Sequence, residues 1–263
     1  MRPGAAEEES VAEAAARAAG AVIRAAAGAG PRRVSLKAAV DLVSEVDVAA
    51  EAAVVAVLAD RSPGVPVYAE EGGGAEHATT RWIVDPLDGT TNFVHGLPIY
   101  AVSVGLQVDG QMVAGCIYDP VHDLAYTASR GRGARRNGAP IAVSSTKDLG
   151  QALLATGFPI DKRERADYYL SFVARALRAG QGVRRGGSAA TDLTWVACGA
   201  LDGFFELGLH AWDVAAGMLL VTEAGGRVTD LTLVELDLDR PRLLATNGWI
   251  HDELSALLAP LLS

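Results

Sequence analysis

The chain has 263 residues, half of them hydrophobic, and a formal net charge of −9. This length suffices for one large domain or two closely packed ones, and a chain of this size buries roughly three quarters of its unfolded surface without disulfide bonds. The acidic balance argues against direct nucleic-acid binding, which needs a basic face. It leaves a phosphorylated small molecule open as a partner, because a bound metal ion can invert the local field.

The two cysteines, Cys116 and Cys198, lie in apolar stretches, so we expect buried free thiols. The N-terminal residues are acidic and lack an apolar core, which argues against a signal peptide. No apolar run approaches the roughly 18 residues that a membrane span needs. The sequence therefore predicts a soluble, cytoplasmic protein.

The first part of the chain predicts two helices followed by strands. Helices are expected over residues 10–27 and 48–59, a loop or short hairpin over 32–44, and strands over 65–69, 82–84, 100–108, 111–119 and 124–128. Ser44-Glu45-Val46-Asp47 resembles a capping box before the second helix. Asp109-Gly110, between two alternating runs, is typical of a hairpin turn. We therefore expect a mostly antiparallel sheet here.

Beyond residue 145 the pattern changes to alternating strands and helices. Strands are expected over 153–157, 203–207, 226–230 and 243–246, and helices over 165–178, 189–199, 212–224 and 252–262. Such alternation indicates an α/β layer. The predicted fold class is therefore α+β followed by α/β, with two tightly packed subdomains at 1–145 and 146–263.

One stretch, WIVDPLDGTTNF at residues 82–93, draws attention. Its apolar start predicts the end of a buried strand, and Pro86 holds Asp85 extended. Gly89 permits a sharp turn. Thr90, Thr91 or Asn92 is then expected to cap a short helix that Gly96 and Pro98 would stop.

The same stretch brings two carboxylates, Asp85 and Asp88, to a helix N-terminus, where anions are favoured. Two carboxylates about 4 Å apart repel by roughly 4 kcal/mol at an effective dielectric constant of 20. A hard divalent cation removes this conflict, and Mg²⁺, held by few carboxylates and by substrate phosphate oxygens, fits best. The stretch therefore predicts metal-assisted phosphate chemistry.

Two motifs resemble those of a known family. DPLDGTTNF, at residues 85–93, is similar to the first signature of the inositol monophosphatase family, and WDVAAGMLLVTEAGG, at 212–226, to its second. The resemblance extends from about residue 37 to 246. It implies a layered α-β-α-β-α fold, Mg²⁺-dependent and lithium-sensitive phosphomonoester hydrolysis, and a homodimer.

The resemblance also implies the ligands of two or three Mg²⁺ ions. These are Glu70, Asp85, the Leu87 carbonyl, Asp88 and Asp213. Most of them fall in the 1–145 subdomain, and the 146–263 subdomain supplies Asp213. Glu70 and Glu71 are adjacent at a strand end and point to opposite sides; the resemblance selects Glu70, which also orients the attacking water. Thr90, supported by Asp47, helps to orient it, and Lys37 matches a position near the metals.

A substrate pocket is implied in the same way. Its residues are Leu87, Asp88, Gly89, Thr90, Arg184, Gly187, Ser188, Ala189, Glu206 and Asp213. Glycine lets backbone N–H groups approach a ligand closely, and Glu206 can accept hydrogen bonds from sugar hydroxyls. Arg185 could replace Arg184, because the sequence does not say which one points inward. For His95 and His210 we expect supporting or packing roles.

The expected reaction is in-line attack by a metal-activated water, without a phosphoenzyme. Leu87-Asp88-Gly89-Thr90 superficially resembles the haloacid-dehalogenase phosphatases, but Pro86 stands where their nucleophilic aspartate would be. Inositol monophosphate is the first choice of substrate. Fructose-1,6-bisphosphate, histidinol phosphate and NADP are alternatives implied by relatives. A regulatory role through a transcription-factor partner is an alternative of another class.

Overall fold

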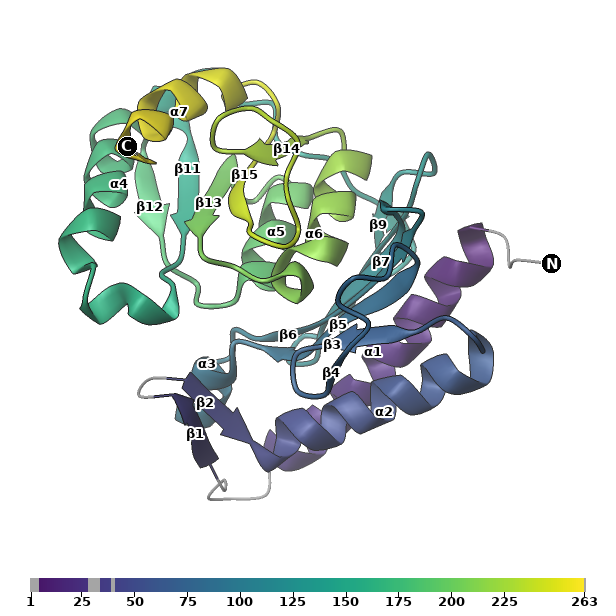
Figure 1. Cartoon of the computed structure of the whole chain (residues 1–263). Helices are drawn as coiled ribbons and strands as arrows, with labels where there is room; N and C mark the ends of the chain where they lie inside the picture. Colours follow the sequence, from purple (N-terminus) through teal and green to yellow (C-terminus); the bar gives the residue numbers. More distant parts are fainter. Residues whose placement is uncertain (1–4, 28–33, 39–40, 263) are drawn as a thin grey trace.

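The computed structural model describes residues 5–27, 34–38 and 41–262, with side chains for 6–27 and 45–262 (Figure 1). Its α-helices are α1 (Ala5–Ala27), α2 (Glu45–Arg61), α3 (Thr90–His95), α4 (Ala166–Ala179), α5 (Ala189–Ala197), α6 (Ala211–Glu223) and α7 (His251–Leu258). Short 3₁₀ turns cover Leu149–Gln151, Ile160–Arg163 and Ala259–Leu262. No helix among these described residues is long and apolar enough to cross a membrane.

The strands form a hairpin and two sheets. The hairpin pairs β1 (Val34–Ala38) with β2 (Asp41–Ser44). The larger sheet has the order β10-β9-β8-β7-β6-β5-β3-β4. Its strands are β3 (Val67–Ala69), β4 (Gly73–Gly74), β5 (Arg81–Asp88), β6 (Ala101–Val108), β7 (Gln111–Asp119), β8 (Leu124–Ser129), β9 (Ala134–Arg136) and β10 (Ala139–Pro140). The smaller sheet, in the order β12-β11-β13-β15-β14, contains β11 (Leu153–Thr156), β12 (Gly182–Arg184), β13 (Gly203–Leu207), β14 (Arg227–Asp230) and β15 (Arg242–Thr246).

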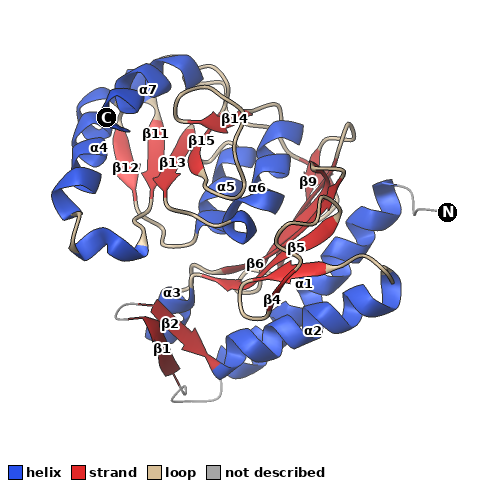
Figure 2. Cartoon of the chain, viewed as in Figure 1, coloured by secondary structure: helices blue, strands red, loops and turns tan. Residues whose placement is uncertain are grey.

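These elements stack as α-β-α-β-α, which confirms the predicted fold class (Figure 2). Helices α1 and α2 cover one face of the larger sheet, and α5 and α6 cover the other. The same α5 and α6 pack against the smaller sheet, whose outer face carries α4 and α7. The middle helical layer therefore contacts both sheets.

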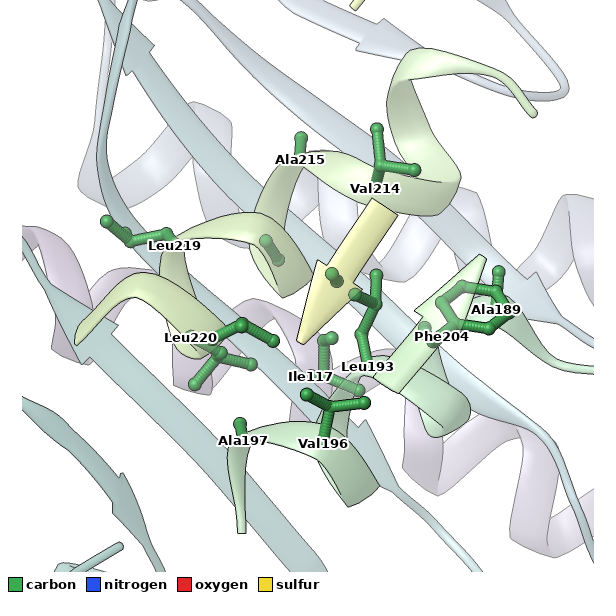
Figure 3. Close-up of a cluster of buried hydrophobic side chains, with 14 of the residues drawn as sticks. Ile117, Ala189, Leu193, Val196, Ala197, Phe204, Val214, Ala215, Leu219 and Leu220 are labelled. Atoms are coloured by element: carbon green, nitrogen blue, oxygen red, sulfur yellow. The ribbon is translucent and has the colours of Figure 1, made fainter. Parts of the chain in front are cut away.

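Alternation along the strands divides the core between the layers. On β5, Trp82 and Val84 belong to the core beneath α1 and α2, whereas Ile83 points to the middle layer. On β13, Phe204 faces the middle layer and Phe205 the outer helices. Successive strand side chains point to opposite faces, so each sheet has two buried sides. Figure 3 shows how the middle core draws side chains from α5, α6, β7 and β13.

Close packing at one glycine sets the position of α6. Gly115 on β7 lies so near this helix that an added Cβ would be 3.2 Å from the Cα of Ala216. The Ser103 hydroxyl on β6 donates a hydrogen bond to the Trp212 carbonyl oxygen at 3.0 Å. These contacts fix the N-terminal turn of α6 above the middle of the larger sheet.

The main local difference from prediction lies at 82–93. Strand β5 continues through Pro86 to Asp88, instead of ending near Asp85, and its register with β6 shifts between Asp85 and Asp88. Proline is tolerated at such an irregularity because a ladder hydrogen bond is already lost there. The expected cap is also wrong: Gly89, in the left-handed region at φ 93°, precedes α3 without a side-chain cap, and Thr90 and Asn92 lie inside the helix.

Other predicted elements agree within a few residues. Helix α1 begins five residues earlier than expected and α2 begins at Glu45. The 32–44 region contains a hairpin, and the 109–110 hairpin is confirmed. Strands β4, β9, β10 and β12 were not predicted. The side chains of Lys37 and Ser44 lie outside the described residues. Both thiols are free as expected, but only Cys116 is buried, and Cys198 is half-buried.

Candidate metal centre

Glu70 and Asp85 come from the ends of two adjacent strands. Strands β3 and β5 run parallel, with Ala69 paired to Val84, so their carboxyl ends meet at one edge of the sheet. The Glu70 N–H donates to the Val84 carbonyl oxygen at 3.2 Å. The buried Asp85 carboxyl accepts a hydrogen bond from the Leu87 N–H at 3.0 Å. This pairing carries Glu70 to the position beside Asp85. The next residue, Glu71, donates its N–H to the Glu51 carboxylate on α2.

Asp213 reaches the same place from the other half of the chain. It lies in the first turn of α6, where its Oδ2 accepts a hydrogen bond from the His210 N–H at 2.6 Å. Asp85, Asp88 and Asp213 each offer a carboxylate oxygen within 4.8 Å of the others. Two acidic side chains at the end of β5 and one at the start of α6 therefore form one cluster, which we call the acidic centre.

The acidic centre is electrostatically strained without a cation. Burial and the neighbouring carboxylates of Glu70, Asp88 and Asp213 raise the pKa of Asp85 well above its usual range. Burial and the Asp213 carboxylate raise the pKa of Asp88 to about 7, and burial and the Glu70 carboxylate raise the pKa of Asp213 to about 7. A group of hard oxygen donors that repel one another is the environment that Mg²⁺ prefers. The residues present therefore fit such an ion.

Asp88 also links the two parts of the molecule. Its Oδ2 accepts hydrogen bonds from the Ser188 hydroxyl at 2.7 Å and from the Ala190 N–H at 2.6 Å, both at the start of α5. Ser188 is the N-cap of that helix and also accepts from the Thr191 N–H. The loop before α5 is tied down in the same region, because the Asn92 side-chain amide donates to the Gly186 carbonyl at 2.9 Å.

Thr90 occupies the predicted position beside the acidic centre. Its hydroxyl lies 2.8 Å from Asp47 Oδ1 and 3.1 Å from the Leu87 carbonyl oxygen. Asp47 is completely buried on α2. When the hydroxyl proton is donated to Asp47, the Thr90 oxygen keeps free lone pairs that can accept a hydrogen bond. The contact thus leaves Thr90 as an acceptor near the acidic centre.

A cavity of about 150 Å³ opens next to Asp88 and Asp213. Its lining includes Gly157, Arg185, Gly187, Ser188, Ala189, Asp192 and Glu206. Gly157 lies directly against Glu206, so a Cβ on it would be 2.1 Å from the carboxylate and would displace that side chain. Both arginines are exposed, but Arg185 lines this cavity and Arg184 does not. A second hollow, of about 370 Å³, adjoins it at Glu206 and Asp213 and includes Glu70.

Sequence reasoning missed Asp192 in this cavity. It resembles an ordinary acid near a helix start, yet it is 1% exposed. Its signal was available in the sequence: it is the single charged side chain in α5, a helix otherwise made of small, apolar and threonine residues. His210 has the expected supporting role, because its ring stacks on Trp212 with centroids 4.8 Å apart.

Comparison with known proteins agrees with this geometry. A model of the inositol monophosphatase family matches residues 5–262. An inositol-1-monophosphatase of Synechocystis sp. is 44% identical over 221 residues, which are 83% of this chain and 77% of the relative. The Nus factor SuhB of Pseudomonas aeruginosa is 44% identical over 220 residues, 81% of each chain. The solved inositol monophosphatase of Anabaena (Nostoc) sp. has a TM-score of 0.86 at 42% identity and covers 96% of this chain and 95% of its own.

Proposed function

This chain belongs to the inositol monophosphatase family, and we propose that it is a Mg²⁺-dependent phosphatase that hydrolyses inositol monophosphate. One observation carries the proposal: Asp85, Asp88 and Asp213 converge within 4.8 Å beside a cavity lined by Glu206. We propose that Glu70 and the Leu87 carbonyl complete the oxygen ligands of two or three ions. Bound Mg²⁺ would supply Lewis acidity, which lowers the pKa of water and stabilises charge on the leaving oxygen.

The chain's own residues would hold the reactants. Thr90, whose hydroxyl lies 2.8 Å from Asp47 Oδ1, presents an acceptor oxygen for a water molecule, and Glu70 is proposed to share that task. The backbone around Gly89 and Thr90 is proposed to hold the phosphate. Because Pro86 offers no nucleophile two residues before Asp88, the water attacks phosphorus directly. Hydrolysis of a chiral phosphate ester should therefore invert the configuration at phosphorus.

Substitution of the acidic centre tests this proposal. Asp88→Asn and Asp213→Asn should each reduce phosphate release from inositol monophosphate by roughly 100-fold or more, because several kcal/mol of metal-derived stabilisation are lost. Release by the wild type should require Mg²⁺ and decrease with added Li⁺. Asp60→Asn, at an exposed position on α2, is the matched control and should retain full activity. Undiminished turnover in both centre variants would contradict the assignment.

The identity of the phosphate ester is a separate part of the proposal. Glu206 and the Gly187-Ser188-Ala189 turn support a polyol, but fructose-1,6-bisphosphate, histidinol phosphate and NADP share the same phosphate chemistry. Comparing initial rates on these four esters would decide among them. If one of the last three esters released phosphate faster, the proposed role of the acidic centre would stand. That ester would then replace inositol monophosphate as the proposed substrate.

A second role is favoured by the relative from P. aeruginosa, which is named as a Nus factor. We propose as the alternative that this chain binds a component of the transcription machinery, and that it does so as a homodimer. Pull-down of purified RNA polymerase and Nus factors by Asp88→Asn protein tests the role apart from catalysis. If neither the wild type nor the variant bound any of these proteins, the transcription role would be excluded. Light scattering would give the oligomeric state and so test the homodimer.

A further inference from the structure

The most unusual polar group outside the acidic centre is the carboxyl of Asp192. It is 1% exposed, and its Oδ1 is the one buried side-chain oxygen or nitrogen without a hydrogen-bond partner in the described part of the chain. Buried polar atoms in folded proteins are nearly always paired, so an exception requires an explanation. A purely structural side chain here would more simply be apolar, like Leu193 beside it.

Asp192 lies in the wall of a cavity, although its Oδ1 is itself closed to solvent. The residue lines the cavity of about 150 Å³ together with Asp88, Asp213 and Glu206. On another side it lies against Gly186, where an added Cβ would be 2.7 Å from Oδ1. Neither that backbone nor the helix gives Oδ1 a donor. No described residue therefore supplies this partner, and the cavity beside Asp192 has room for a group that does.

The cavity wall combines acidic side chains with one arginine, Arg185. Burial and the Asp88 carboxylate raise the pKa of the Asp192 carboxyl well above its usual range, and the Arg185 charge acts in the opposite direction. Burial and the neighbouring acids, Asp213 first, also raise the pKa of Glu206 on β13, again opposed by Arg185. Arg185 thus already supplies positive charge to both carboxyls, and the group still missing is a donor such as a hydroxyl.

We propose that Asp192 is a specificity-determining residue that accepts a hydrogen bond from a hydroxyl group of the substrate's polyol, in addition to Glu206. This inference rests on the proposed phosphatase function and deepens it. It predicts a preference for phosphate esters whose alcohol carries several hydroxyl groups. A site built to pair a substrate hydroxyl disfavours esters that lack it, because its own polar group then stays unpaired.

The test compares two substrates in Asp192→Ala, Asp192→Asn and wild-type protein. One substrate is the polyol phosphate that the wild type hydrolyses fastest, starting with inositol monophosphate, and the other is p-nitrophenyl phosphate, which has no hydroxyl. The ratio of their kcat/KM values should fall roughly tenfold in Asp192→Ala, as expected for one lost hydrogen bond, and mostly through KM. Asp192→Asn, which retains a carbonyl acceptor, should give an intermediate ratio.

A control on the same helix separates this role from folding. Thr194→Val changes a buried residue of α5 that does not line the cavity, and it should leave the substrate ratio unchanged. The melting temperature of Asp192→Ala should not fall below that of Thr194→Val, since no intramolecular hydrogen bond of Oδ1 is lost. Equal losses on both substrates together with a lower melting temperature would overturn the inference in favour of a structural role.

The failures of the two proposals differ. If the wild type hydrolyses the polyol phosphate and the ratio is unchanged in Asp192→Ala, the inference is wrong and the proposed function stands. If the wild type with Mg²⁺ hydrolyses no polyol phosphate, the proposed function and the inference both fail.

Discussion

In the acidic centre, three carboxyl groups have the arrangement that a cation site needs. Asp85, Asp88 and Asp213 each have a raised pKa, because burial and neighbouring carboxylates, Glu70 among them, disfavour their charged forms. Protons and a metal ion therefore compete for the same oxygens.

The first signature predicted Asp85 and Asp88 because two acids at one turn already imply a cation. Asp192 and the choice of Arg185 over Arg184 could not be predicted, since both depend on which way a side chain points after folding.

A single histidine gives a pH-dependent prediction away from the site. His251 is fully buried between the hydroxyls of Thr229 and Thr246, and burial lowers its pKa from 6.5 to about 4. The unfolded chain binds this proton first, so the contribution to stability is complete above pH 6.5 and is lost as the pH falls towards 4. The contribution of His251 to the free energy of unfolding should decrease by roughly 2–3 kcal/mol across this window, while carboxyls with raised pKa values, such as Asp88 and Asp213, act in the opposite direction.

Urea unfolding of wild type and His251→Gln at pH 7 and pH 4.5 measures this effect. The variant should be less stable at pH 7, and the difference from wild type should shrink at pH 4.5. His77→Gln, at an exposed histidine, serves as the control and should keep the wild-type pH dependence. A stability difference that stays the same at both pH values would refute the buried, neutral state of His251.

At the level of elements, the position of α6 depends on a close approach to the larger sheet. In Gly115→Ala the new Cβ would lie 3.2 Å from both Cα and Cβ of Ala216, three residues after Asp213. Backbone atoms cannot rotate away, so α6 has to shift. We expect a loss of about 1–3 kcal/mol in the free energy of unfolding, as in other overpacked cores. Activity should fall as well, because Asp213 moves with its helix.

A double-mutant cycle checks the Gly115 prediction. Adding Ala216→Gly to Gly115→Ala removes the opposing methyl group and should recover part of both the stability and the activity. Additive losses, with no recovery, would show that the helix does not rest on this contact.

The sequence predicted both β7 and α6, since their periodic patterns are local. It did not predict their contact, nor the continuation of β5 through Pro86, because both depend on neighbours distant in the chain.

For the whole molecule, the decisive feature is that the middle helical layer belongs to the second half of the chain and covers the sheet of the first. The alternation of the strands indicated layered sheets, and the motif resemblance supplied the order of the layers. The parallel pairing of β3 and β5, which brings Glu70 to Asp85, was not predicted, because a three-residue strand gives no signal of its partner. We propose that the division at residues 145 and 146 marks two subdomains that depend on each other.

This dependence leads to a prediction about fragments. Without α5 and α6, fragment 1–145 would expose Ile83, Met112 and Ile117, which are buried in the intact chain. Fragment 146–263 would expose the opposite side of the same core, together with Asp213. Exposed apolar surface of this extent costs more than either fragment's remaining core can offset, because whole domains are stable by only about 5–15 kcal/mol.

Neither fragment alone should therefore show a cooperative thermal transition in calorimetry. The two fragments expressed together should co-purify and unfold in one transition. Mg²⁺ should move this transition to higher temperature, because the proposed ligands come from both fragments. If either fragment unfolded cooperatively on its own, it would be an autonomous domain. The acidic centre would then form when two already folded domains associate.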